Sequence, residues 1–130
     1  MAIVQRVIAE PKNRNRIISI LSFFYYYTSS YSKLMNVKIG NSVTIIGNRA
    51  FATCRSLTTV TMGKNVIFIA IYAFGWCSTL TNFYFNGTTH PEYGSGAFDS
   101  CSSLNTIYVP TTYQGNSFIG KTIKKELTPM

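Results

Sequence analysis

Four short segments of the chain alternate apolar and polar residues in a way that predicts β-strands. In residues 59–62, Val60 and Met62 would point to one side and Thr59 and Thr61 to the other. This period of two is typical of a half-buried strand. The same pattern recurs at residues 37–39, 83–85 and 107–109. We therefore expect four strands, each with one buried and one exposed face.

The strands belong to a repeat with a fixed step. Its landmarks are an Ala-Phe pair, a cysteine and a leucine, each of which recurs after 23 and then 24 positions. They are Ala50-Phe51, Ala73-Phe74 and Ala97-Phe98; Cys54, Cys77 and Cys101; and Leu57, Leu80 and Leu104. A period in the twenties is the signature of a solenoid, in which each repeat forms one coil. We predict a short right-handed β-solenoid of the leucine-rich-repeat type, with one parallel sheet of about four strands.

The repeat divides the chain into three parts. Residues 34–110 hold the repeats, residues 1–33 form a basic and aromatic N-terminal segment, and residues 111–130 form a C-terminal cap and basic tail. In the tail, Tyr113 and Phe118 are expected to fold back over the last strand. Parallel strands left uncovered at either end would be templates for pairing with other chains, which the two flanks would prevent.

The N-terminal segment carries a dense apolar and aromatic block at residues 17–27. Its eleven residues are too few to span a bilayer, which takes about 20. A basic stretch before an apolar block is also the order of a signal peptide, but the long basic lead and the run of tyrosines fit one poorly. Stepping back 23 positions from Ile46 reaches Phe23. This favours a degenerate repeat that caps the stack.

Charge placement disfavours a nucleic-acid-binding surface. The formal net charge is +8, but residues 34–110 carry four cations and two carboxylates, so that most of the charge lies in the flanks. Nucleic-acid sites instead line a continuous stripe or groove with cations. Binding of the basic flanks to nucleic acid or to an anionic membrane is the weakest of the functions considered.

The residue types of catalysis and metal binding are sparse. The four carboxylates are scattered, and no paired acids, GxSxG motif or phosphate-binding glycine loop is present. No two cysteines have the two-to-four-residue spacing of a zinc knuckle. Cys54, Cys77 and Cys101 would instead form a buried row of small apolar side chains about 5 Å apart. We expect a chain that is not an enzyme and holds no cofactor or metal.

The pattern V-x-x-I-G-x-x-A-F-x-x-C-x-S-L-T at residues 43–58 resembles the leucine-rich repeats of BspA-like surface proteins. Residues 96–110, which close with I-Y-V-P, are similar to the last repeat of such arrays. The resemblance covers about residues 34–110. It implies a repeat scaffold found in bacterial and protist surface proteins and associated with adhesion to host matrix and to other cells. By this resemblance the chain is expected at the cell surface or secreted.

The function expected is therefore a non-catalytic module that binds a protein, such as a host matrix or cell-surface protein, with no transmembrane segment. The alternative is a structural module that associates with other copies through its solenoid ends. The binding surface would be the outward side of the four strands. Its residues are Asn36, Lys38, Thr59, Thr61, Asn82, Tyr84, Thr106 and Tyr108.

Two residues of the third repeat depart from the pattern. His90 aligns with Val43 and Val66, but it is the only histidine, so a hydrogen-bonded and partly exposed role is expected rather than a metal site. Asn86 begins an Asn-Gly-Thr glycosylation sequon and is expected in a surface turn. A glycan there would require export of the chain.

Overall fold

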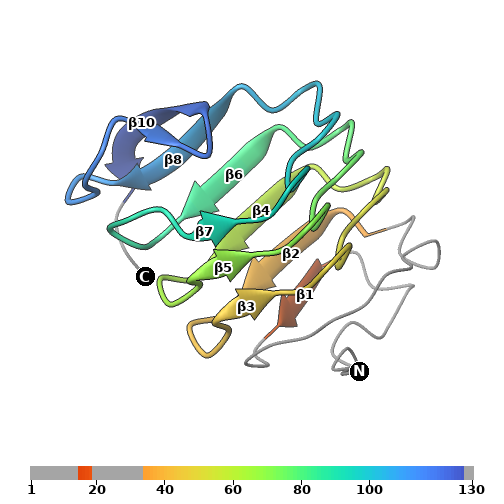
Figure 1. The fold of residues 1–130 in the computed structure, drawn as a ribbon, viewed down its shortest axis with the longest axis horizontal. Coiled ribbons are helices and arrows are strands. Elements are labelled where there is room, and N and C mark those ends of the chain that lie inside the picture. Colours follow the sequence, from red (N-terminus) through yellow and green to blue (C-terminus); the bar gives the residue numbers. More distant parts are fainter. Residues whose placement is uncertain (1–14, 19–33, 128–130) are drawn as a thin grey trace.

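The computed structural model describes residues 15–18 and 34–127 and shows a β-solenoid whose main sheet has seven strands (Figure 1). The strand order is β1-β2-β4-β6-β8-β10-β9. All neighbours are parallel except β9 and β10, which are antiparallel. The strands are β1 (Asn15–Ile18), β2 (Asn36–Ile39), β4 (Thr59–Met62), β6 (Asn82–Phe85), β8 (Thr106–Pro110), β9 (Ser117–Phe118) and β10 (Lys121–Leu127).

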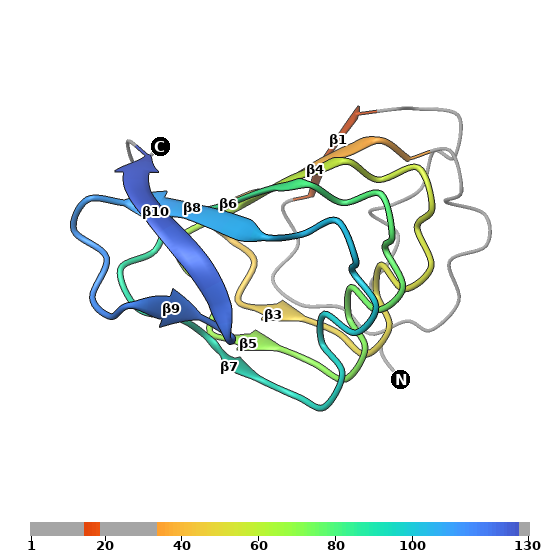
Figure 2. The same ribbon diagram turned by 90° about the horizontal axis from the view of Figure 1, so that it is seen from above.

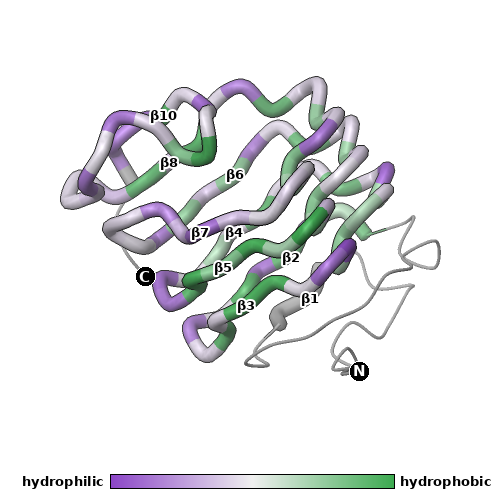
Figure 3. Tube along the Cα trace, viewed as in Figure 1, coloured by the Kyte–Doolittle hydropathy of each residue, from purple (hydrophilic) through white to green (hydrophobic). Residues whose placement is uncertain are grey.

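A second, smaller sheet faces the main one across the core (Figure 2). Its three parallel strands are β3 (Ile45–Ile46), β5 (Phe68–Ile69) and β7 (Glu92–Tyr93). Ile46 and Ile69 are fully buried, whereas both residues of β7 are exposed. Figure 3 shows a matching change in hydropathy, because β3 and β5 are hydrophobic and β7 is not. The last coil is therefore less closed than the first two.

The solenoid predicted from the repeat is confirmed, and so are the faces of its four strands. The inward residues are buried without exception: Val37, Ile39, Val60, Met62, Phe83, Phe85, Ile107 and Val109. The main sheet is wider than the four strands predicted. β1 pairs with β2 at one side, and β10 pairs with β8 at the other. Neither addition carries the Ala-Phe, cysteine and leucine landmarks that define the repeat.

Opposite the sheet, the coils are joined by backbone hydrogen bonds between equivalent loops. The N–H groups of Tyr72, Phe74 and Trp76 donate to the carbonyl oxygens of Ser95, Ala97 and Asp99 at 3.1, 2.8 and 2.7 Å. Arg49, Phe51 and Thr53 donate in the same way to Ile71, Ala73 and Gly75 at 2.9, 2.7 and 2.8 Å. The first and third donors of each set have positive φ: 56° and 59° for Arg49 and Thr53, and 53° and 60° for Tyr72 and Trp76. The shared strain identifies this backbone shape as a property of the coil rather than of one site.

Phenylalanine rings fill the centre of the stack. Phe51, Phe74 and Phe98 lie parallel, with neighbouring centroids 5.2 and 5.3 Å apart. Phe118 of β9 packs against Phe85 at 5.2 Å and against Phe98 at 6.4 Å, and is fully buried. The C-terminal residues thus cover the sheet side of the last coil. The predicted cap residues Phe23 to Tyr27 lie outside the described residues.

Candidate protein-binding surface

The eight outward residues lie on the solvent side of four neighbouring strands. Lys38 is exposed, and the other seven are half-buried: Asn36, Thr59, Thr61, Asn82, Tyr84, Thr106 and Tyr108. Each alternates with a buried residue, so backbone pleating holds it on this face. The surface is therefore built by the same alternation that builds the core.

Strand register aligns these residues into rows across the sheet. Lys38 pairs with Thr61, Thr61 with Tyr84, and Tyr84 with Tyr108. The row continues to Lys124 of β10, which pairs with Tyr108. Sequence reasoning missed Lys124, because it lies within residues 111–130, which the sequence predicts to be a cap and basic tail. A second row contains Asn36, Thr59 and Asn82, which are also register partners.

Tyr84 and Tyr108 form the most distinctive feature of the face. Their rings stack with centroids 5.1 Å apart and planes inclined by 25°. Each ring restricts the rotation of the other, so the pair presents a large apolar area with two phenolic hydroxyls at little further cost in side-chain entropy. Next to it, Lys124 Nζ lies 3.8 Å from Glu126 Oε2, and both side chains are largely exposed.

Comparison with protein families identifies the repeats. Residues 16–127 match six copies of the BspA type leucine-rich repeat region. The chain belongs to the BspA-type leucine-rich repeat family. The match begins within β1 and ends at the last residue of β10, so it takes in the strands that the visible motif left out.

A solved structure has the same fold. The leucine-rich cell surface protein of Faecalibacterium prausnitzii A2-165 is similar to this BspA-type chain with a TM-score of 0.63 and 23% sequence identity. The similarity covers 78% of this chain and 27% of that protein, so the chain spans about a quarter of its length. Comparison with curated proteins finds no match.

The cysteines form the buried row expected in this BspA-type chain. Cys54, Cys77 and Cys101 are free thiols, and the Sγ atoms of Cys77 and Cys101 each donate to a carbonyl oxygen, of Phe51 and Phe74 respectively, at 3.0 Å. The pKa of Cys101 is raised, mainly by its hydrogen bond with the Cys77 thiol and secondly by burial. The Cys101 thiol lowers the pKa of Cys77, but interaction with Cys54 and burial outweigh it, and that pKa is raised overall. Since the thiolate is the reactive form, both groups are poor nucleophiles.

Asn86 does not lie in the surface position expected of a glycosylation site. Its side chain is 3% exposed, and Nδ2 donates to the carbonyl oxygen of Met62 at 3.4 Å. The prediction of a surface turn is therefore wrong, because both the backbone N–H and the side chain of Asn86 bond to Met62 of the preceding coil. An attached glycan would require Nδ2 to leave the interior. Oδ1 is buried without a hydrogen-bond partner among the described residues.

His90 is exposed, and its Nδ1 lies 2.9 Å from the carbonyl oxygen of Pro91. Pro91, and not His90, is the buried residue at this corner. Within residues 15–18 and 34–127, no group of three or more histidine, cysteine or carboxylate side chains could hold a metal ion. The same part of the chain has no helix long and apolar enough to cross a membrane.

An exposed aromatic cluster on the opposite side of this BspA-type solenoid was not predicted. Arg49 Cζ lies 4.8 Å from the centroid of the Tyr72 ring, and the Tyr72 and Trp76 rings are 4.8 Å apart. Trp76 is 39% exposed. These residues occupy the variable positions beside the Ala-Phe pairs. Comparing those positions across repeats would have indicated that they are neighbours.

Proposed function

We propose that this chain is a non-catalytic protein-binding module that contacts its partner with the exposed face of the main sheet. The observation that carries the proposal is the stacked pair of Tyr84 and Tyr108 within an aligned row of polar side chains. Tyrosine is enriched among the residues that dominate interface energies, because it is large, stiff and polar at its tip. The thiols are buried and the carboxylates are sparse, so the chain has few candidate groups for catalysis.

The size of the face sets the expected strength of binding. The five strands from β2 to β10 span about 19 Å between the outermost axes, and a four-residue strand is about 13 Å long. This area is smaller than one side of a standard protein–protein interface. A single copy would therefore bind weakly, on the order of micromolar, and display of many copies would raise the avidity.

The partner class proposed is a matrix or cell-surface protein, with adhesion as the outcome. Support comes from the BspA-type family and from the similarity in fold to a leucine-rich cell surface protein. Charge on the face is modest, so steering by long-range electrostatics would contribute little. Shape complementarity around the tyrosine pair would decide which partner binds.

The test compares matched variants in a binding assay against a panel of immobilised extracellular-matrix proteins. Tyr84→Ala and Tyr108→Ala are expected to weaken binding about tenfold or more each, the loss typical of an interface hot spot. Arg55→Ala, an exposed change away from the sheet face, should leave binding unchanged. Equal losses from all three variants, or none from the tyrosine variants, would refute the sheet face as the binding surface.

A further inference from the structure

The last coil leaves a row of backbone N–H groups without acceptors. Gly96, Phe98 and Ser100 stand one repeat after Tyr72, Phe74 and Trp76, whose N–H groups bond to the next coil. The φ values of Gly96 and Ser100, 69° and 57°, show that the coil shape is kept. Yet these three N–H groups donate to no acceptor within residues 15–18 and 34–127.

This edge presents donors only. The carbonyl oxygens of Ser95, Ala97 and Asp99 already accept hydrogen bonds from the preceding coil. Two copies placed with these edges together would set N–H against N–H, so the edge cannot pair with itself. It is complementary to a row of acceptors at every second residue, which is what each coil presents to the coil before it.

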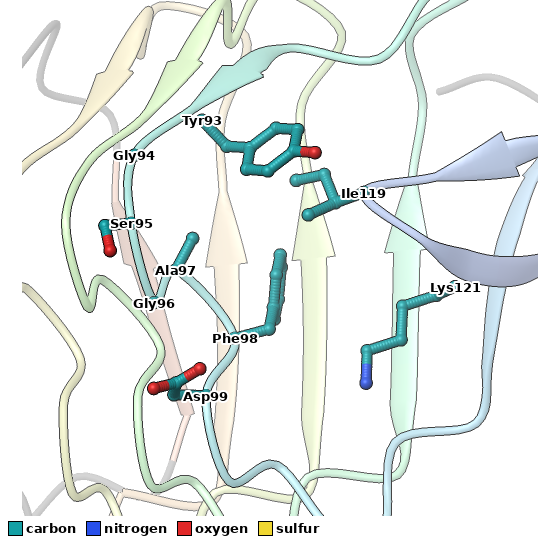
Figure 4. Close-up of a pocket in the computed structure, with 9 residues that line it drawn as sticks. All are labelled: Tyr93, Gly94, Ser95, Gly96, Ala97, Phe98, Asp99, Ile119 and Lys121. Atoms are coloured by element: carbon teal, nitrogen blue, oxygen red, sulfur yellow. The ribbon is translucent and has the colours of Figure 1, made fainter.

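A recess of about 330 Å³ lies beside the donor row. Figure 4 shows Tyr93, Phe98 and Ile119 around its apolar part, with Asp99 and Lys121 at the other end. Tyr93 is 51% exposed, although it aligns with the buried Ile46 and Ile69 of the earlier coils. The last coil thus leaves apolar surface open where the first two close it.

Lys121 supplies a cation to the lining of the recess. Its Nζ donates to the carbonyl oxygen of Leu104 at 3.4 Å and makes no ion pair with the described residues. Asp99 opposes it at the rim, so the balance between these two charges should set the affinity for an acidic ligand.

We propose that the donor row and the recess form a second binding site, which takes an extended acidic peptide segment of a partner protein. Alternate carbonyl oxygens of the segment accept from Gly96, Phe98 and Ser100. One apolar side chain enters the recess, and a carboxylate lies beside Lys121. The site is separate from the sheet face, so either proposal can fail without the other. Main-chain bonding of this kind supplies affinity, and the recess supplies selectivity.

The probe is an acetylated and amidated synthetic peptide that copies residues 91–100. This sequence has two carboxylates, one phenylalanine and no cation, and in the solenoid its carbonyl groups accept from the preceding coil. The full chain, labelled with ¹⁵N, is titrated with the peptide to millimolar concentration. The amide signals of Gly96, Phe98 and Ser100 are expected to shift downfield and saturate, whereas those of Phe74 and Trp76 stay in place.

Three variants distinguish binding of the peptide at the recess from nonspecific attraction between opposite charges. Lys121→Gln should weaken binding about two- to fivefold, the range for an exposed ion pair, and Asp99→Asn should strengthen it. Lys64→Gln, at an exposed lysine that neither lines the recess nor belongs to the sheet face, is the matched control and should have little effect. Unchanged amide signals of Gly96, Phe98 and Ser100 at millimolar peptide would overturn the proposal. So would equal binding of a scrambled peptide, or the same shifts on raising the protein concentration alone, which would identify a second copy as the occupant.

Discussion

The ring of Phe74 lies parallel to that of Phe51, with centroids 5.2 Å apart and planes inclined by 9°. Phe98 stacks on its other face at 5.3 Å, and Phe83 of β6 meets it edge-on at 5.5 Å. Phe74 is fully buried. Three successive coils and the main sheet therefore depend on one side chain for their packing.

Replacing Phe74 by alanine should destabilise the chain by about 3 to 5 kcal/mol, because a large cavity opens in the middle of the stack. Thr61→Ala on the exposed face should cost less than about 1 kcal/mol. Urea unfolding followed by tryptophan fluorescence would measure both free energies. Comparable losses from the two variants would show that the buried and exposed faces are assigned wrongly.

Gly96 and Gly120 form a matched pair for testing the tight contact between coils. Both have positive φ, 69° and 77°. A Cβ at Gly96 would overlap the ring of Tyr72, whereas one at Gly120 would meet nothing within 4 Å. Gly120→Ala should therefore cost only the conformational penalty of about 1 to 2 kcal/mol, and Gly96→Ala clearly more. Equal thermal stability of the two variants would contradict the close approach at Tyr72.

The buried thiols predict a loss of stability at alkaline pH. The pKa values of Cys77 and Cys101 are raised above their ordinary value of 9.0, so the folded chain keeps both protons where the unfolded chain releases them. Above pH 9 the unfolded state binds fewer protons, and the free energy of unfolding falls as pH rises, by up to about 1.4 kcal/mol per pH unit for each thiol. Below pH 9 this contribution is fully present.

Urea titrations at pH 8, 9 and 10 would measure this dependence. The control is the double variant Cys77→Ala/Cys101→Ala, in which other alkaline groups still titrate. Its free energy of unfolding should fall less steeply with pH than that of the unaltered chain. Parallel pH profiles would mean that the thiols do not account for the effect.

Removing residues 1–33 should promote association. β1 pairs with β2 from Asn15↔Asn36 to Ile18↔Ile39, so a chain that begins at Leu34 exposes the unpaired edge of β2. Such an edge is a template for strands of other molecules. Light scattering should detect oligomers or precipitation of the shortened chain. A monomer of unchanged stability would instead identify the segment as a tail or targeting signal.

The repeat made the core predictable because the inward positions are held to apolar residues in every coil. Val60 and Met62 could be assigned to the buried face from alternation alone, and register then placed Tyr84 beside Tyr108. The ends were harder, because an end strand packs on one side only. The sequence of β10 resembles a basic tail, because three of its residues are lysines. In the structure most of its described side chains are indeed exposed.

Local departures from the repeat could not be predicted from the sequence either. The positive φ positions carry Arg49, Thr53, Tyr72 and Trp76 instead of the glycines that normally mark them. Asn86 is typical of a turn residue, and its burial follows from its bonds to Met62 in the preceding coil, which no motif encodes. The end of the repeats near residue 110 was visible in the sequence, but which N–H groups it leaves unpaired follows only from the hydrogen-bond pattern.

Hydroxyl-radical footprinting of the chain bound to its partner would test the binding face most directly. Tyr84 and Tyr108 on the main sheet, and Trp76 on the opposite side, are oxidisable side chains within one molecule, so each complex carries its own control. We predict that binding slows oxidation of Tyr84 and Tyr108 and leaves Trp76 as reactive as in the free chain. Protection of Trp76 with no change at Tyr84 and Tyr108 would contradict the account.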